Sequence, residues 1–313
     1  MPVRRGPAGL LRQAEGWILE PGSARSLAAL RIGLCLLLAV RLSRSVYVQL
    51  AGQPSVLFRP LSFMRLLQAM PSREVVLTIQ ALAIAASLMA AGGVAARISL
   101  PVAWLGAVFL NGMWTSVGQP MHNETLLLLA MVPLLCAPST DAWSLAEVGR
   151  GRTSGRSVRY GWPVRTSMIV VAGGYFFSGF NKLVFSGPAW VFSDNLRWIL
   201  YGISDQNRRP IAAALLLASH PLAAHAVAGL SLATEIGFPI VLWKPRLVGI
   251  FVPAAVLLHV GIGITMHLDY SAWAATAVVV FVRWEALADR LARRRKAGAA
   301  LVGPGLAHGS GLP

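Results

Sequence analysis

Long apolar segments separated by short polar stretches make up most of the chain, and this pattern predicts membrane-spanning helices. A helix needs about 20 mostly apolar residues to cross the hydrocarbon core of a bilayer. We therefore expect an all-α, polytopic integral membrane helical bundle of about eight transmembrane helices. The expected helices lie at residues 26–48, 74–94, 98–117, 123–139, 164–185, 221–243, 246–268 and 270–284.

The segments between and beyond these helices suggest a simple domain organisation. Residues 1–25 form a basic N-terminal segment, residues 26–285 the transmembrane domain, and residues 286–313 a basic tail. The tail is rich in Gly, Ala and Pro from residue 297, so we expect it to be partly disordered. Residues 188–219 carry spaced Trp and Tyr, which favour the headgroup level, and we expect this stretch to lie at the membrane interface.

The composition agrees with a membrane protein and gives an orientation. Hydrophobic residues make up 56% of the 313 residues and charged residues only 13%. The net charge of +16 does not indicate a nucleic-acid partner, because the arginines lie between apolar segments. Arginines concentrate near both termini and in the 140–165 loop, which the positive-inside rule assigns to the cytoplasmic side. We expect a multi-pass protein of the cell membrane with both termini cytoplasmic.

Lys182 is the most informative single residue. The chain has 28 Lys and Arg residues, of which only Lys182, Lys244 and Lys296 are lysines. Lys182 alone falls near the end of an expected transmembrane helix, where a charge is costly and is a functional candidate by default. Arginine stays protonated, whereas a lysine in such a place can release its proton and act as a base. Lys182 could equally extend its ammonium group to the lipid headgroups.

Other polar residues are expected to share the bundle interior with Lys182. Tyr175, Ser178 and Lys182 have helical spacing on the fifth helix, and His259 and His267 lie eight residues apart on the seventh. Further candidates are His122 and Asn123 at the start of the fourth helix and Glu235 in the sixth. Polar groups in lipid should face inward and find one another or a water-filled cavity.

Each candidate also has a structural interpretation. His122 could cap the fourth helix, His259 could be a core histidine bonded to a carbonyl, and His267 could be interfacial. Glu235 could pair with Lys182 or with an arginine. Gly173, Gly174 and Gly179 favour close helix packing over phosphate binding.

The sequence predicts no metal site. Cys35 and Cys136 fall within apolar segments and have the pattern neither of a zinc site nor of a disulfide framework. A haem held by two histidines is an open alternative, but nothing specifies which two would ligate it.

Several segments together carry a resemblance to a known family. In chain order they are R-I-G-L-C-L-L-L, M-H-N-E-T-L-L-L-L, G-Y-F-F-S-G-F-N-K-L-V-F-S-G-P-A-W, T-E-I-G-F-P and H-V-G-I-G-I-T-M. The chain resembles the HTTM family, multi-pass membrane proteins related to the vitamin K-dependent gamma-carboxylase, over roughly residues 25–285.

The resemblance implies a chemistry and roles for the candidate residues. In the carboxylase, a lysine in the corresponding segment deprotonates vitamin K hydroquinone, oxygen adds, and the resulting basic oxide removes a glutamate proton so that carbon dioxide can add. Lys182 matches that lysine as catalytic base, and His122 and His259 match assisting histidines. Glu235 matches an intramembrane acidic position. Together with Tyr175, Ser178, Asn123 and His267, it is a candidate to bind the cofactor.

The resemblance also has a limit, and three functions stay open. We expect no counterpart of the carboxylase's large C-terminal domain, so carboxylation of peptide glutamate by this chain alone is not expected. One hypothesis is a bacterial, quinol-dependent enzyme of the lyase class that uses reduced menaquinone or vitamin K hydroquinone. The alternative is a membrane maturation factor for a secreted peptide or toxin, without redox chemistry and working with a partner subunit. A transport role ranks third.

Overall fold

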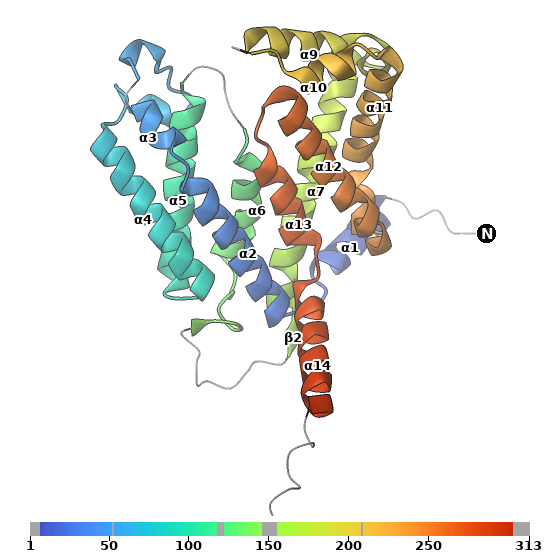
Figure 1. Ribbon diagram of the computed structural model, residues 1–313. Coiled ribbons are helices and arrows are strands. Elements are labelled where there is room, and N and C mark those ends of the chain that lie inside the picture. The colour runs from blue at the N-terminus through green and yellow to red at the C-terminus, as the bar shows by residue number, and fades with distance from the viewer. Residues whose placement is uncertain (1–6, 52, 118–121, 146–154, 208, 303–313) are drawn as a thin grey trace, which may run out of the picture. The chain divides into compact units, whose positions relative to one another are not determined.

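Helices account for nearly all regular structure in the computed structural model, which describes residues 7–51, 53–117, 122–145, 155–207 and 209–302 (Figure 1). The first seven α-helices are α1 (Pro7–Ile18), α2 (Ala24–Leu42), α3 (Val46–Ala51), α4 (Arg73–Gly92), α5 (Ala96–Thr115), α6 (Thr125–Leu135) and α7 (Val158–Ser186). The other seven are α8 (Ala189–Phe192), α9 (Asn195–Gln206), α10 (Ala212–Ala218), α11 (Pro221–Gly237), α12 (Val248–Met266), α13 (Ser271–Phe281) and α14 (Trp284–Val302). Short 3₁₀ helices are η1 (Ser55–Leu57), η2 (Ser62–Leu66), η4 (Phe238–Leu242) and η5 (Pro245–Leu247).

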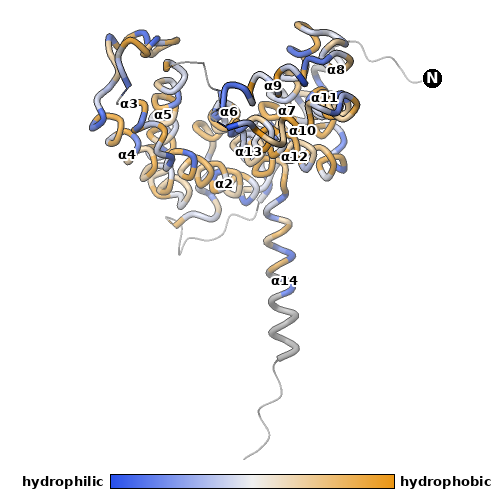
Figure 2. Tube along the Cα trace, turned by 45° about the horizontal axis from the view of Figure 1, so that its top comes forward, coloured by the Kyte–Doolittle hydropathy of each residue, from blue (hydrophilic) through white to orange (hydrophobic). Residues whose placement is uncertain are grey.

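Within the part of the chain that the structure describes, five helical segments are long and apolar enough to cross a membrane, as expected for an integral membrane protein. They are α4, α5, α7, α11 continued by η4, and α12 preceded by η5, and a sixth results if α13 and the start of α14 form one broken span. Hydrophobic residues run along α4 and α12 in Figure 2. Each of the eight predicted segments holds a helix, but the count of eight spans is not confirmed. The helix α2 contains three arginines, and α6 has only 11 residues.

The chain divides into two compact units, Met1–Phe281 and Val282–Pro313. The second contains α14, which continues to Val302. The helix thus includes residues 297–302, for which the sequence predicts disorder, whereas residues 303–313 lie outside the described part.

A short strand pair ties the N-terminal region to the loop before α7. Strand β1 (Gly22–Ser23) pairs antiparallel with β2 (Arg156–Ser157). Next to the pair, Arg165 forms an ion pair of 2.7 Å with Glu20, and the Arg156 guanidinium donates to the Pro21 carbonyl at 2.8 Å. These two arginine-bearing segments therefore share one end of the bundle, at the start of α7.

The predicted interfacial stretch follows the opposite end of α7. It folds into α8, α9 and α10, and α9 and α10 lie together at the top of Figure 1. Leu200, Ile211 and Ala214 belong to an apolar cluster that is separate from the main core and includes residues of α11. Trp198 on α9 is 70% exposed, which suits a side chain at the headgroup level.

Small residues bring α7 close to its neighbours. A Cβ added at Gly174 would lie 2.6 Å from the Leu126 side chain, and one at Gly179 would lie 2.9 Å from Glu235 Cβ. The prediction of close packing at these two glycines is confirmed. Gly173 differs, because an added Cβ there would meet only Phe177 of the same helix, at 4.0 Å. The close approach at Gly179 places α11 where Glu235 can reach α7.

Candidate functional site

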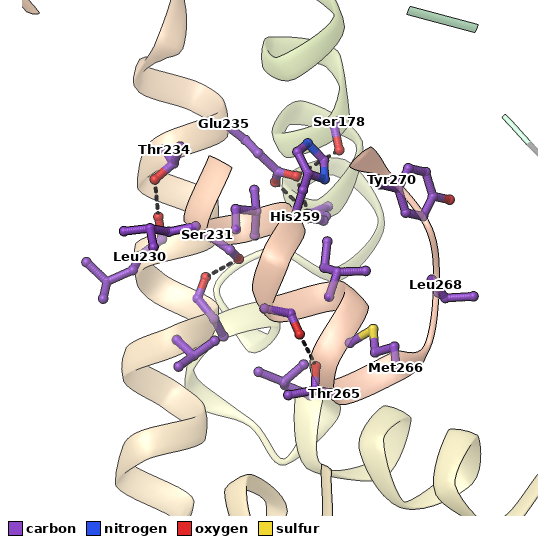
Figure 3. Close-up of a pocket in the computed structure, with 18 of the residues that line it drawn as sticks. Ser178, Leu230, Ser231, Thr234, Glu235, His259, Thr265, Met266, Leu268 and Tyr270 are labelled. Carbon is purple, nitrogen blue, oxygen red and sulfur yellow. Dashed lines mark hydrogen bonds and ion pairs between the residues drawn. The ribbon is translucent and has the colours of Figure 1, made fainter. Parts of the chain in front are cut away.

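A cavity of about 790 Å³ lies among α7, α11 and α12, with α9 and α10 contributing to its wall. Its size is within the range of small-molecule sites. Six of the eight candidate residues line it: His122, Tyr175, Ser178, Lys182, Glu235 and His259. Figure 3 shows Ser178 and Glu235 meeting near His259, with Thr265 and Met266 farther along α12. Candidates more than 130 positions apart in the sequence thus share one space.

Lys182 and Glu235 form an ion pair in the cavity wall. Lys182 Nζ lies 2.6 Å from Glu235 Oε1 and 2.5 Å from Oε2, and the Ser178 hydroxyl donates to Oε1 at 2.9 Å. Of the two pairings that the sequence leaves open for Glu235, the structure shows the one with Lys182. The Glu235 side chain is 7% exposed and that of Lys182 23%, so the lysine is the more accessible partner.

The local fold explains this arrangement. Ser178 and Lys182 are four residues apart and therefore lie on one face of α7. Gly179 lies between them and lets the α11 backbone approach closely. The Glu235 side chain is therefore long enough to contact both Ser178 and Lys182. Trp190, just beyond the end of α7, places its ring 5.1 Å from Lys182 Nζ, where the ring's π face attracts a cation.

His259 and Tyr175 form the second polar pair. His259 Nε2 lies 3.1 Å from the Tyr175 hydroxyl, and the Tyr175 ring stacks on Phe238 at a centroid distance of 4.4 Å. This stacking fixes the hydroxyl toward His259. His259 Nδ1 is buried and has no hydrogen-bond partner among the described residues. The predicted alternative of a core histidine satisfied by a carbonyl therefore does not describe His259.

His122 and Tyr270 form a third pair at the cavity. Tyr270 Oη lies 3.0 Å from His122 Nε2, and the Trp273 indole donates to the His122 carbonyl at 3.1 Å. Burial lowers the pKa of His122 below its ordinary value and raises the pKa of Tyr270. Both groups are therefore neutral near pH 7, and they can exchange donor and acceptor roles through the shared hydrogen bond.

Two candidates lie away from the cavity wall. The Asn123 side chain is buried and donates to the Asp269 carbonyl at 2.6 Å, which joins the segment before α6 to the one before α13. His267 ends α12 with a left-handed backbone, at φ 54°, and its side chain is exposed. The position of His267 fits the interfacial alternative considered for it.

The sequence interpretation missed several residues of the site. Trp190, Tyr270 and Trp273 line the cavity but were not candidates. Trp190 could have been found from the sequence, because it closely follows the Lys182 segment. Tyr270 and Trp273 become visible only through the contacts that bring α13 beside His122.

Most of the remaining wall is apolar and opens toward the outside. Leu230 on α11 and Leu257 on α12 both line the cavity, and they are 69% and 70% exposed. The hydroxyls of Ser231, Thr234 and Thr265 bond to carbonyls of their own helices, so they add little polarity to the cavity. Both helices, α11 and α12, belong to segments that are long and apolar enough to cross a membrane.

These features can be tested against a quinol-sized ligand. The aromatic and aliphatic walls fit a ring with an apolar tail, and the three polar pairs supply donors and acceptors. Trp190 also lines the cavity, and its Nε1 is a buried donor without a hydrogen-bond partner in the described part of the chain. Such a donor suits a ligand oxygen. The described residues hold no group of three or more His, Cys, Asp or Glu side chains that could bind a metal ion.

Comparison with known proteins adds no family assignment. The chain matches no family model, and no curated protein or solved structure is significantly similar to it.

Proposed function

We propose that the chain is an integral-membrane enzyme that binds a reduced quinone in the α7–α11–α12 cavity and uses Lys182, paired with Glu235, as its general base. The observation that carries the proposal is the ion pair itself, which lies in the wall of a largely apolar cavity. The resemblance to the membrane domain of the vitamin K-dependent gamma-carboxylase supports the same assignment.

The choice of lysine at this position supports a role in proton transfer. A purely structural pair with Glu235 could use arginine, the common cation of this chain, which binds carboxylates more strongly through two parallel hydrogen bonds. Lysine instead offers a single nitrogen that can give up a proton. Its greater exposure, compared with Glu235, leaves it able to meet a ligand.

The pair as a whole can accept one proton. Lys182 can pass a proton to Glu235 across the 2.5 Å contact, which leaves a neutral amine to take the proton of a ligand hydroxyl. The result is an ammonium group next to a protonated carboxyl, with Ser178 still bonded to Oε1. When bound, the quinol would supply the acidic hydroxyl and the reducing equivalents for a reaction with oxygen. The pairs His122–Tyr270 and His259–Tyr175 would orient the ring through their neutral hydrogen-bonding groups.

The same proposal includes the topology. With eight spans, the β1–β2 end of the bundle and both termini are cytoplasmic, and the cavity lies in the outer half of the bilayer. The arginines near β1 and β2 support this orientation through the positive-inside rule.

The alternative function is a maturation factor that binds a secreted peptide. The observation in its favour is the exposed apolar surface of Phe192 and Trp198, at 78% and 70%, beside the helices that wall the cavity. In this case the polar groups would bind a peptide without redox chemistry.

Turnover of reduced menaquinone or vitamin K hydroquinone under oxygen tests the proposal. We expect purified protein to convert the hydroquinone to its epoxide, and Lys182→Ala and Lys182→Arg to lower the rate by about 10²–10⁴-fold, the usual contribution of a general base. Lys244→Arg is the matched control, because Lys244 is an exposed lysine outside the cavity, and it should retain the wild-type rate. No turnover by the wild type with either quinol, or full activity of Lys182→Arg, would contradict the proposal.

A second arm of this experiment locates the bound ligand. Gly261 lines the cavity and an added Cβ there meets nothing within 4 Å, so Gly261→Phe should fill the cavity and raise the KM for hydroquinone. Gly249→Phe is the matched control on the same helix, because an added Cβ there also meets nothing within 4 Å but Gly249 does not line this cavity. Equal effects of the two substitutions would place the quinol elsewhere.

A further inference from the structure

A second cluster of charged side chains lies next to the cavity, and the proposed chemistry does not use it. Arg41 near the end of α2 contacts Glu124 through Nε at 2.8 Å and through Nη2 at 2.5 Å. Its Nη1 donates to Asp269 at 2.9 Å and to the Ser271 hydroxyl at 2.8 Å. The side chains of Arg41 and Glu124 are 7% and 3% exposed, so the pair is shielded from solvent.

The sequence positions of these partners give the cluster its significance. Glu124 lies two residues after His122, and Asp269 and Ser271 lie on either side of Tyr270. Arg41 therefore connects the two segments that carry the His122–Tyr270 pair, and α2 supplies the arginine from a third part of the chain.

Other bonds strengthen the same connection. Asn123 donates to the Asp269 carbonyl at 2.6 Å, and Arg44 forms a second ion pair with Asp269 at 3.0 Å. Asp269 also accepts from the Ser271 backbone N–H and hydroxyl at 3.0 and 2.6 Å. The bonds converge on Asp269, which directly precedes Tyr270.

We infer that Arg41 is a positioning residue whose bonds to Glu124 and Asp269 hold His122 and Tyr270 against each other at the cavity. Arginine suits this role because its planar fork donates in several fixed directions at once, which the single ammonium of lysine cannot do. Arg41 acts through its partners, since it does not line the cavity itself. An effect of Arg41 on the reaction rests on the proposed function. The contacts by which Arg41 holds the two segments together, here called the Arg41 clamp, do not.

A matched control exists on the same helix. Arg31 is fully buried and donates to backbone carbonyls, that of Trp143 at 2.7 Å and that of Ala91 at 3.3 Å. It does not line the cavity. Arg31→Lys should therefore reproduce the general effect of replacing a buried arginine of α2 on packing, without acting on the His122–Tyr270 pair.

The first test measures the distance between the two segments without any assumption about function. His122→Cys and Tyr270→Cys would be introduced together into a protein with Cys35→Ala and Cys136→Ala, and the rate of cross-linking by the short bifunctional reagent dibromobimane would be followed. We expect Arg41→Lys to slow the cross-linking at least fivefold and Arg31→Lys to leave it within twofold of the parent. Equal rates with and without Arg41 would overturn the inference. If Arg41→Lys does not yield folded protein, Asp269→Asn is the substitute. It weakens the contact of Arg41 with Asp269, a residue outside the helices, and should also slow the cross-linking.

The second test measures the effect on turnover. Arg41→Lys and Tyr270→Phe should each lower hydroquinone turnover, and the double variant should be no slower than the slower single variant, because both act through one contact. Arg31→Lys combined with Tyr270→Phe should give the product of the single effects. Additive effects for Arg41 would count against the inference. Failure of the proposed function is distinct, because the wild type would then show no turnover while the cross-linking result is unchanged.

Discussion

Two buried glutamates, Glu235 and Glu124, have opposite surroundings in this bundle. Glu235 pairs with a lysine that is 23% exposed and lines a cavity. Glu124 pairs with an arginine that is 7% exposed and does not line this cavity. The first pair is accessible to a ligand, whereas the second is enclosed by the segments that it joins.

The difference shows what each cation is suited to do. Arg41 makes bonds in three directions and so holds a geometry, while Lys182 keeps a nitrogen within reach of the cavity. A buried ion pair is weak evidence for stability, because desolvation of the charges can exceed their attraction. The comparison therefore supports the two proposals, positioning by the Arg41 cluster and proton transfer by the Lys182 pair.

The largest effect on stability is expected at Glu124. Glu124→Ala leaves Arg41 buried without its main partner, and removal of one member of a buried pair costs about 3–5 kcal/mol. We expect a strongly lowered midpoint of thermal unfolding in detergent, and a smaller shift for Glu235→Gln, whose lysine partner can reach the cavity. Glu74→Ala, at an exposed glutamate on α4, should change the midpoint little. A larger loss from Glu235→Gln than from Glu124→Ala would reverse the comparison.

A smaller effect is expected from Asp269 in acid. Burial raises the pKa of Asp269, but hydrogen bonds from Ser271 and the charge of Arg41 lower it by more, so that the resulting pKa is about 2. Because the pKa is lower in the folded protein than the ordinary value of about 3.9, Asp269 stabilises the fold above pH 4. This contribution is lost as the pH falls from about 4 to about 2.

The acid effect can be measured as the thermal midpoint against pH. We expect the midpoint of the wild type to fall more steeply between pH 4 and pH 2 than that of Asp269→Asn. Asp205→Asn, at an exposed aspartate on α9, should retain the wild-type slope. Identical slopes for Asp269→Asn and the wild type would show that Asp269 does not titrate as described.

The two clusters also differ in how far the sequence predicts them. The spacing of Tyr175, Ser178 and Lys182 on one helix indicates a polar face, and Glu235 was one of few acids in an apolar segment that could meet it. The Arg41 cluster joins positions 83 and 228 residues apart, and no local pattern indicates such a contact. An arginine within an apolar helix does imply a buried partner, a carboxylate or backbone carbonyls, but the partner's identity depends on tertiary packing.

For the helices too, the sequence predicts what depends on local pattern better than what depends on tertiary packing. Apolar length predicts where the eight helical segments lie, because it depends on local composition alone. It predicts less well which segments span a membrane. The helix α6 stops at Leu135, and α2 carries charges whose partners come from distant segments of the chain.

The central claim is tested most directly by measuring hydroquinone turnover in a variant whose Lys182–Glu235 pair is replaced by uncharged side chains of similar size. Lys182→Met combined with Glu235→Gln replaces both charges by side chains of similar size, a change that often preserves stability. Our account predicts that this double variant unfolds near the wild-type temperature and still binds menaquinone, as followed by tryptophan fluorescence quenching, but loses hydroquinone turnover by at least 100-fold. Turnover at the wild-type rate in the folded double variant would contradict the assignment of Lys182 and Glu235 as the base.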